Sequence, residues 1–226
     1  MEEQFKQIAA LIGDPTRALI MWTLLDGKAF TATELAMLAN TTAPNISMHL
    51  AKLVQAELLS VESQGRHRYY KYARKEVAYA IEAMANLLPA PERQADNNQE
   101  QHSGIKHCRT CYDHLAGKVG VAITDSLLQQ KILLQKNKVF EVSNKGLQWF
   151  ALFEIDITAL QQQRRSFLRP CLDWSERRYH MAGSLAASLL QTMLSADWLR
   201  TTQHSRALVI TGKGQKKLYE HFKLAL

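Results

Sequence analysis

Apolar residues near the start of the chain recur every three or four positions, the spacing of one face of an α-helix. Residues 5–12 and 15–25 follow this pattern, and Pro15 suits the first position of the second helix. Thr31 and Thr42 can each accept a backbone hydrogen bond at the start of a further helix. The pattern therefore predicts four consecutive short helices.

The periodicity becomes strand-like after the fourth helix. Residues 58–62 and 68–72 are rich in β-prone side chains, and Ser63-Gln64-Gly65 between them provides a turn. Two short helices followed directly by a β-hairpin are typical of a winged helix-turn-helix. In that fold the second of the two helices enters the major groove of DNA.

Polar side chains fall where such a fold contacts DNA. In the fourth helix Ile46, Leu50 and Leu53 share one face, so we expect Asn45, His49 and Lys52 to point elsewhere. Basic residues at the tip of the hairpin could reach phosphates or the minor groove. The predicted DNA-binding residues are Thr42, Asn45, Ser47, His49, Lys52, Arg66, His67 and Arg68.

Three stretches of the chain, residues 10–25, 42–59 and 65–72, together resemble the arsenical-resistance-repressor (ArsR) family of bacterial winged-helix regulators. The resemblance implies a homodimer that pairs through the first and last helices of this domain. It also implies one recognition helix in each half of an inverted-repeat operator on double-stranded DNA. Met48 departs from the arginine frequent in the family, so the family's base preferences do not carry over.

The length of 226 residues exceeds that of one winged helix and predicts two domains. Residues 1–88 are expected to form the DNA-binding and dimerisation domain, with an amphipathic helix over 75–88 at its end. Residues 89–103 are polar and contain prolines, which is typical of a linker. Residues 104–226 are then an effector-sensing domain, and the whole chain is α+β, mainly α.

The net charge of +7 is unevenly distributed. Residues 1–88 contain nine Lys or Arg and nine Asp or Glu, whereas residues 101–226 contain 18 and nine. The electrostatic argument for DNA binding is therefore local to the hairpin. The excess positive charge of the second domain favours an anionic effector or nonspecific attraction to phosphates. The chain shows neither a membrane-length apolar run nor a signal-peptide core, which predicts a soluble, cytoplasmic protein.

The second domain contains an approximate internal repeat. Residues 114–117 (HLAG) match residues 180–183 (HMAG), and each copy is followed by an apolar helix. A strand-turn-strand pattern then leads to Ser143 in the first copy and to Thr211 in the second, each suited to cap a helix. The sequence predicts two units of helix, β-hairpin and helix related by a pseudo-twofold axis.

Cysteine, histidine and aromatic residues precede the first helix of each copy, so the two segments could converge on one pocket. The predicted effector-binding residues are Cys108, Cys111, Tyr112, His114, Cys171, Asp173, Trp174, Arg178 and His180. Three chemistries fit them: a small organic effector, a thiolate of low pKa that senses oxidants, and a soft metal ion. The organic effector is preferred, and the cysteines could also be ordinary core residues.

The two metal sites usual in the ArsR family are not expected here. Residues 34–39 contain no cysteine and residues 75–88 contain no histidine. No cofactor, metal ligand or catalytic residue is assigned, because phosphate loops, nucleophile elbows and His-Glu metal motifs are not found. The sequence thus predicts a homodimeric repressor released by an effector, and not an enzyme. The alternatives are a C-terminal thiol redox or metal sensor or enzyme, and an architectural DNA binder without effector.

Overall fold

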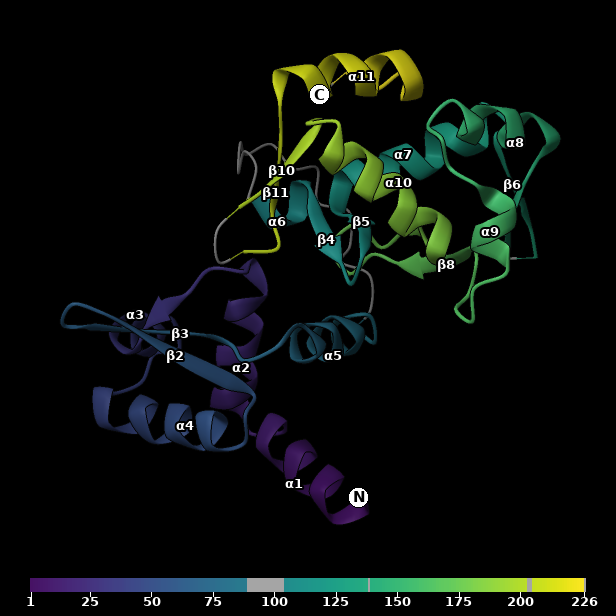
Figure 1. The fold of residues 1–226 in the computed structure, drawn as a ribbon. Helices are drawn as coiled ribbons and strands as arrows, with labels where there is room; N and C mark the ends of the chain where they lie inside the picture. The colour runs from purple at the N-terminus through teal and green to yellow at the C-terminus, as the bar shows by residue number, and fades with distance from the viewer. Residues whose placement is uncertain (89–103, 138, 203–204, 226) are drawn as a thin grey trace. The chain divides into compact units, whose positions relative to one another are not determined.

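A computed structural model describes residues 1–88, 104–137, 139–202 and 205–225 of the chain. The chain divides into two compact units, Met1–Leu87 and Leu88–Leu226, which are considered separately (Figure 1). The predicted linker, residues 89–103, lies outside the described residues.

The first unit is a bundle of short helices with a small antiparallel sheet at one side. Its sheet has the strand order β1-β3-β2. The helices are α1 (Glu2–Ile12), α2 (Pro15–Thr23), the 3₁₀ helix η1 (Leu24–Asp26), α3 (Ala32–Leu38), α4 (Ala43–Gln55) and α5 (Lys75–Ala85); the strands are β1 (Phe30–Thr31), β2 (Leu59–Gln64) and β3 (His67–Tyr72). This order is that of a winged helix-turn-helix.

The helix caps predicted at Thr31 and Thr42 are confirmed, whereas the first helix begins at Glu2, three residues before the predicted start. Thr31 and Glu34 form a capping box, in which the Thr31 amide donates to Glu34 Oε2 at 2.7 Å. The Thr42 hydroxyl accepts from the Asn45 amide at the start of α4. The hairpin turn lies later in the chain than predicted, since Ser63 and Gln64 belong to strand β2. Because Gln64 pairs with His67, the turn is formed by Gly65 and Arg66, and His67 belongs to strand β3.

One apolar core holds the first unit together. The inward faces of α2, α3 and α4 meet the sheet in this core, and α5 adds Val77 and Ile81 to it. The predicted inward residues of α4, Ile46, Leu50 and Leu53, are completely buried. The orientation of α4 is therefore fixed, and its opposite face is left to solvent.

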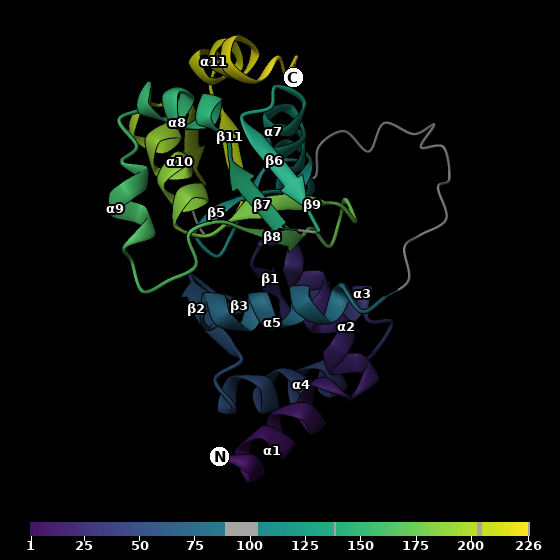
Figure 2. The same ribbon diagram turned by 90° about the vertical axis from the view of Figure 1, so that its right-hand side faces the viewer.

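The second unit is built from short hairpins and helices. Its elements are α6 (Gly104–His107), β4 (Arg109–Cys111), β5 (His114–Ala116), α7 (Gly117–Gln129), β6 (Leu133–Lys136), β7 (Val139–Val142), α8 (Asn144–Ala151), α9 (Ile157–Gln161), β8 (Arg169–Leu172), β9 (Tyr179–Ala182), α10 (Ser184–Ser195), β10 (Leu199–Thr201), β11 (Leu208–Ile210) and α11 (Gly212–Phe222). Strands pair as the hairpins β4-β5 and β10-β11 (Figure 1) and β6-β7 and β8-β9 (Figure 2).

The internal repeat is present in this unit. Each copy contains the predicted helix, hairpin and capped helix: α7, β6-β7 and α8 in the first, and α10, β10-β11 and α11 in the second. Ser143 and Thr211 cap the last helix of each copy, as expected. The structure adds a hairpin before each first helix, β4-β5 and β8-β9, which the sequence pattern did not predict.

The matched glycines of the repeat are required by their backbone conformation. Gly117 and Gly183 follow the added hairpins with φ of +77° and +100°. A Cβ atom on either glycine would lie 2.6 Å from a carbonyl oxygen of the preceding segment. Only glycine therefore lets each hairpin turn directly into its helix.

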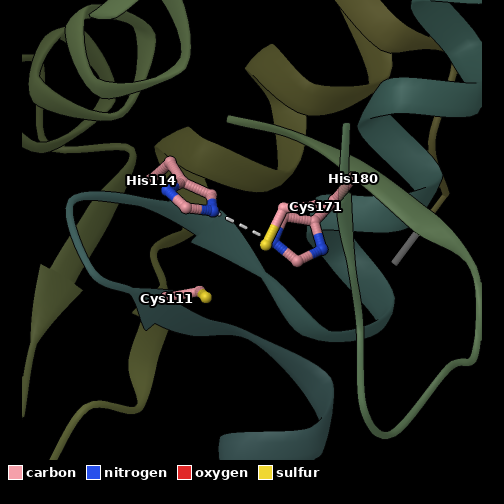
Figure 3. A group of neighbouring side chains, drawn as sticks. All are labelled: Cys111, His114, Cys171 and His180. Atoms are coloured by element: carbon pink, nitrogen blue, oxygen red, sulfur yellow. Dashed lines mark hydrogen bonds between the residues drawn. The ribbon is translucent and has the colours of Figure 1, made fainter. Parts of the chain in front are cut away.

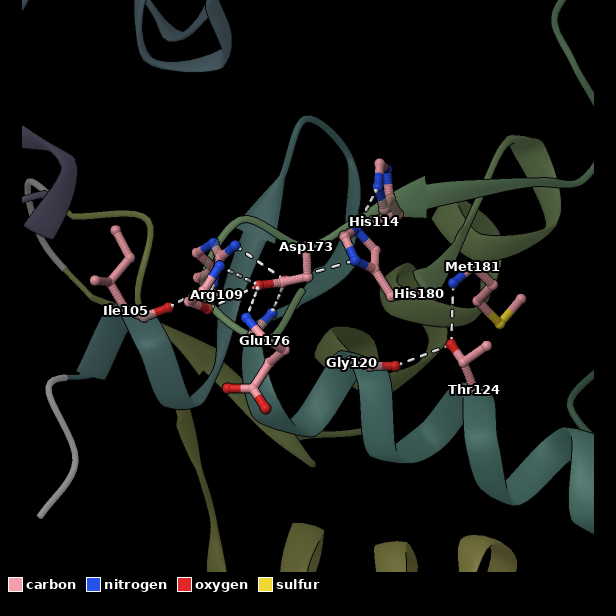
Figure 4. A network of polar contacts seen from close by, with 11 residues as sticks. Ile105, Arg109, His114, Gly120, Thr124, Asp173, Glu176, His180 and Met181 are labelled. Atoms are coloured by element: carbon pink, nitrogen blue, oxygen red, sulfur yellow. Dashed lines mark hydrogen bonds and ion pairs between the residues drawn. The ribbon is translucent and has the colours of Figure 1, made fainter. Parts of the chain in front are cut away.

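The first helix of each copy packs against a strand of the other copy. Helix α7 of the first copy packs against β9 of the second, and α10 packs against β5. Strands β5 and β9 lie next to each other. The Met181 amide on β9 donates to Thr124 Oγ1 on α7 at 2.9 Å (Figure 4). Since both copies contribute to one apolar core, neither copy buries its apolar residues alone.

A buried ion pair also joins the copies. The Arg109 guanidinium on β4 lies 3.0 Å from Asp173 Oδ2 after β8, and both side chains are at most 1% exposed. Asp173 also accepts hydrogen bonds from the Gly117 amide and from Ser175. Burial alone would raise the pKa of Asp173, but Arg109, Ser175 and the Gly117 amide outweigh burial and hold the pKa at about 2.

Removing one member of this pair should destabilise the second unit strongly. Arg109→Met would leave the Asp173 charge buried without its counter-ion, and we expect the free energy of unfolding to fall by about 3–5 kcal/mol. The matched control is Arg178→Met. Arg178 pairs with Asp125 at 2.7 Å but is 60% exposed, so its loss should cost less than about 1 kcal/mol. Urea unfolding of the full chain, followed by tryptophan fluorescence, measures both variants. Equal losses in the two would contradict a special role for the buried pair.

Candidate functional site

The exposed face of α4 is the first candidate site. Its residues recur at helical spacing opposite the buried stripe: Pro44, Ser47, Met48, Ala51, Lys52 and Gln55. Ser47 and Lys52 were predicted from the sequence, whereas Met48, Ala51 and Gln55 were missed. The helical period that places the apolar residues on the buried face also places these residues on the opposite face, so the sequence pattern could have identified them.

His49 corrects the predicted set of DNA-binding residues. It was expected to point away from the core, but it is only 7% exposed. Its Nδ1 atom lies 3.4 Å from Asp14 Oδ1 and 3.5 Å from the Arg17 guanidinium. Arg17 also donates to backbone carbonyls near the end of α1. His49 thus belongs to a polar contact that joins α4 to α1 and α2, and this contact places it away from the exposed face.

The remaining predicted residues at the start of α4 lie near the surface. Thr42 is exposed and caps the helix, while Asn45 is half-buried and donates from its amide to Thr41 Oγ1 at 2.7 Å. The hairpin of β2 and β3 is the wing of this fold. Its residues Arg66, His67 and Arg68 are all exposed. The exposed face of α4 and the basic tip of the wing are the two surfaces of this unit with suitable chemistry for DNA.

A second candidate site lies in the other unit, where two cysteines and two histidines meet. One ligand atom from each of Cys111, His114, Cys171 and His180 lies within 4.8 Å of all the others (Figure 3). Both histidines are buried, and both cysteines are partly buried. The structure therefore brings together four of the nine predicted effector-binding residues.

The repeat explains how these four side chains converge. Cys111 pairs with His114 across the hairpin β4-β5, and Cys171 pairs with His180 across β8-β9. Directly paired residues of a hairpin project their side chains on the same face. Each copy thus contributes one Cys–His pair. Where the copies meet, the Nε2 atoms of His114 and His180 lie 3.1 Å apart.

Each histidine also has an aspartate beside its other ring nitrogen. His114 Nδ1 lies 3.5 Å from Asp113 Oδ1. His180 Nδ1 lies 3.5 Å from Asp173 Oδ2 (Figure 4). Asp113 was not predicted, since an aspartate in a two-residue turn carries no signal of such a contact. The carboxylates favour hydrogen on both Nδ1 atoms, which leaves both Nε2 atoms with lone pairs.

The other predicted effector residues are distributed around this cluster. Cys108 is completely buried in the apolar core, and Tyr112 is half exposed at the tip of β4-β5. Trp174 is buried, with the Arg109 guanidinium 5.2 Å from its ring centre. Arg178 pairs with Asp125. Of these four side chains, only Tyr112 lines a hollow together with a residue of the cluster, His114.

A hollow of about 260 Å³ lies beside His114. It is lined by residues of both copies: Tyr112, Asp113, His114, Arg165, Ser166, Arg169 and Gly183. Of these, only Tyr112 and His114 had been predicted as effector residues. Arg165 forms an ion pair with Asp113, and Arg169 is exposed.

The thiols differ from those expected of an oxidant sensor. A hydrogen bond with Cys171, together with burial, raises the pKa of Cys111 to about 11. Burial raises the pKa of Cys108 to about 12. A reactive sensor needs thiolate at neutral pH and therefore a lowered pKa. The low-pKa thiolate considered from the sequence is thus not present at Cys108 or Cys111.

Comparisons with known proteins place the chain among transcription regulators. A helix-turn-helix domain model matches residues 12–62. The uncharacterized HTH-type transcriptional regulator YdfF of Bacillus subtilis (strain 168) is 38% identical over 226 residues, which cover the whole of both chains. The transcriptional repressor SdpR of the same organism is 38% identical over 77 residues, covering 34% of this chain and 84% of SdpR.

One solved structure resembles part of the chain. HlyU from Vibrio cholerae N16961 is 22% identical with a TM-score of 0.36, and the match covers 38% of this chain and 92% of HlyU.

Among the described residues, no helix has the length and apolar character needed to span a membrane. The full-length match and the winged helix together establish the identity: this chain belongs to the HTH-type transcriptional regulators, DNA-binding proteins of the kind that its resemblance to the ArsR family implied.

Proposed function

We propose that the chain acts as a homodimeric repressor that recognises an inverted-repeat operator through α4 and the wing, and that a ligand of the second unit releases it. The observation that carries the proposal is the exposed face of α4, which the buried stripe orients outward. Ser47, Lys52 and Gln55 on this face supply donors and acceptors for base edges and phosphates. Arg66 and Arg68 on the wing supply positive charge for the backbone.

The exposed side chains of α1 support the proposed dimer. None of the residues of α1 is fully buried, and Phe5 is 71% exposed. An exposed phenylalanine on an amphipathic helix favours association. A second copy is the partner that the ArsR resemblance implies for this helix, and a C2 interface would place the same face on both subunits.

The second unit supports the proposal of a regulatory ligand. The hollow beside His114 is lined by Arg165 and Arg169, which suit an anionic molecule. A tenfold change in operator affinity requires only about 1.4 kcal/mol of coupling between ligand and DNA. We propose no catalytic reaction for this unit. Its proposed contribution to regulation is ligand binding.

Basic residues of the wing should contribute to affinity on any DNA sequence, whereas the face of α4 should contribute to specificity. We expect Arg66→Ala and Arg68→Ala each to weaken binding to operator and scrambled duplexes alike and to reduce the salt slope by about 1. Ser47→Ala and Gln55→Ala should weaken operator binding selectively. Operator sites selected from a random duplex library, followed by fluorescence anisotropy at several salt concentrations, provide the measurement.

The control for these DNA-binding variants is Arg200→Ala. Arg200 is an exposed arginine of the second unit that pairs with Asp197. Its removal should leave the salt slope unchanged. If all four test variants lose affinity equally on both duplexes, the base-reading face has been assigned to the wrong residues.

Phe5→Glu should convert the dimer to monomers, because it places a charge in the proposed apolar interface. Leu152→Glu is the matched control, since Leu152 in the second unit is 72% exposed. Sedimentation equilibrium of the full-length variants distinguishes the two states. A dimer that survives Phe5→Glu unchanged would exclude α1 as the main interface.

Binding of the regulatory ligand should leave a measurable trace on the purified protein. Native mass spectrometry of the freshly purified full chain is expected to show a retained ligand, and its removal should change operator affinity about tenfold or more. Operator titrations before and after removal provide this comparison. Unchanged affinity would refute regulation by that ligand.

A further inference from the structure

We propose that Cys111, His114, Cys171 and His180 together bind one zinc ion, which joins the two repeated hairpins. This inference goes beyond the proposed function. It concerns metal binding by the second unit, which can be measured in the absence of DNA. The ligand types are those of a Cys₂His₂ zinc site, in which soft thiolates and imidazoles surround a tetrahedral ion.

The spacing of the donor atoms fits such an ion. Zinc bonds of about 2.0–2.3 Å in a tetrahedron separate the ligand atoms by roughly 3.3–3.8 Å. The two histidine Nε2 atoms lie 3.1 Å apart, and all four ligand atoms lie within 4.8 Å of one another. Side-chain adjustments of less than about 1 Å therefore complete the coordination, and the backbone of the hairpins need not move.

The carboxylates beside the two histidines favour a cation between the rings. With hydrogens on the Nδ1 atoms toward Asp113 and Asp173, both Nε2 atoms carry lone pairs that face each other at close range. Placing a hydrogen on one Nε2 would relieve this repulsion, but would leave that ring's Nδ1 lone pair facing a carboxylate. A cation between the Nε2 atoms satisfies both rings at once. Carboxylates behind metal-bound histidines are the usual outer partners of zinc sites.

One ring nitrogen adds an independent observation. His180 Nδ1 is buried and has no hydrogen-bond partner among the described residues, although Asp173 lies 3.5 Å away. Asp173 already accepts from Arg109, Gly117 and Ser175. A metal on Nε2 makes the Nδ1 hydrogen more acidic, which strengthens its attraction to this carboxylate.

The charge balance also suits a largely buried site. Binding breaks the two S–H bonds of Cys111 and Cys171, and both protons pass to solvent while two sulfur–zinc bonds form. Two thiolates and two neutral imidazoles around Zn²⁺ give a complex of no net charge. Burial of a neutral complex avoids the large cost of an isolated buried charge.

The closed ligand set defines what such a site can do. Four protein ligands fill a tetrahedral ion, so that no position remains for water or substrate. Because two ligands come from each repeat, the ion would hold β4-β5 and β8-β9 together. The site would stabilise the second unit in the arrangement that also forms the hollow beside His114.

The test uses the full chain, purified with a non-chelating reductant, stripped of metal with a chelator and titrated with Zn²⁺ or Co²⁺. We expect one zinc ion per chain by elemental analysis. The Co²⁺ form should show the absorption bands of a tetrahedral ion and a thiolate charge-transfer band. Alkylation followed by mass spectrometry should label Cys111 and Cys171 in the stripped protein and find both protected after Zn²⁺ is added.

Variants separate the cluster from the other thiol. Cys171→Ser and His180→Asn should each lower zinc affinity more than 100-fold, since loss of a ligand exceeds the 10–100-fold effect of losing an outer partner. Cys108→Ala is the matched control: it removes a buried thiol of the same segment that is not part of the cluster. This control should bind one ion as the parent chain does. Circular dichroism confirms that each variant is folded.

Several results would overturn the proposal. They are a six-coordinate Co²⁺ spectrum, zinc content well below one ion per chain, and folded cluster variants that bind zinc as tightly as the parent chain. A disulfide between Cys111 and Cys171 that persists under the reductant and replaces the metal would also refute it. The Co²⁺ spectrum and the alkylation pattern of the parent chain decide the matter even if a variant fails to fold.

Discussion

Asp173 is the buried charge on which the second unit depends. Its carboxylate lies between the two repeats and accepts hydrogen bonds from a guanidinium, a backbone amide and a hydroxyl. These partners come from both copies, so the carboxylate is satisfied only when the copies are correctly docked. Apolar packing alone would tolerate some sliding between the copies. A fully buried ion pair does not, because displacement would leave two charges without partners in an apolar environment.

The repeat turns this single constraint into a precise arrangement of side chains. Arg109, Cys111 and Ala116 occupy the same positions in β4-β5 as Arg169, Cys171 and Ala182 occupy in β8-β9. The copies nevertheless use their matched arginines differently. Arg109 is buried against Asp173, whereas Arg169 is exposed at the edge of the hollow. Duplication thus supplies two similar hairpins, and the asymmetric ion pair fixes how they meet.

Several features of the fold could be predicted because they depend on residues close in sequence. Caps at Thr31, Thr42, Ser143 and Thr211 require only a side chain and an amide three residues away, so the local sequence specifies them. The hairpins β4-β5 and β8-β9 escaped prediction because their strands contain few β-prone residues, whereas β7 and β11, although as short, are rich in valine, isoleucine and phenylalanine. His49 was misplaced for another reason. Its burial depends on Arg17 and Asp14 in a different helix, and this long-range contact has no trace in the periodicity of α4.

The candidate sites also contain parts that the sequence pattern predicts and parts that it does not. The exposed face of α4, which we propose binds DNA, follows from the helical period, although the prediction used only polar residues and so omitted Met48 and Ala51. The convergence of Cys111 with Cys171 was anticipated from the repeat, and the structure brings these two residues together. Cys108 was grouped with them by proximity in sequence alone. Cys108 lies between α6 and β4, outside the paired strands, and is buried in the apolar core.

The pairing of one cysteine and one histidine across each hairpin has a consequence for how the cluster forms. Each hairpin by itself offers one cysteine and one histidine. As a bidentate ligand it would hold a soft ion weakly. Because both hairpins belong to one polypeptide, the second pair of donors is supplied at an effective concentration set by folding and not by the amount of protein in the cell. Assembly of the four donors is therefore a first-order event, independent of whether two chains have met.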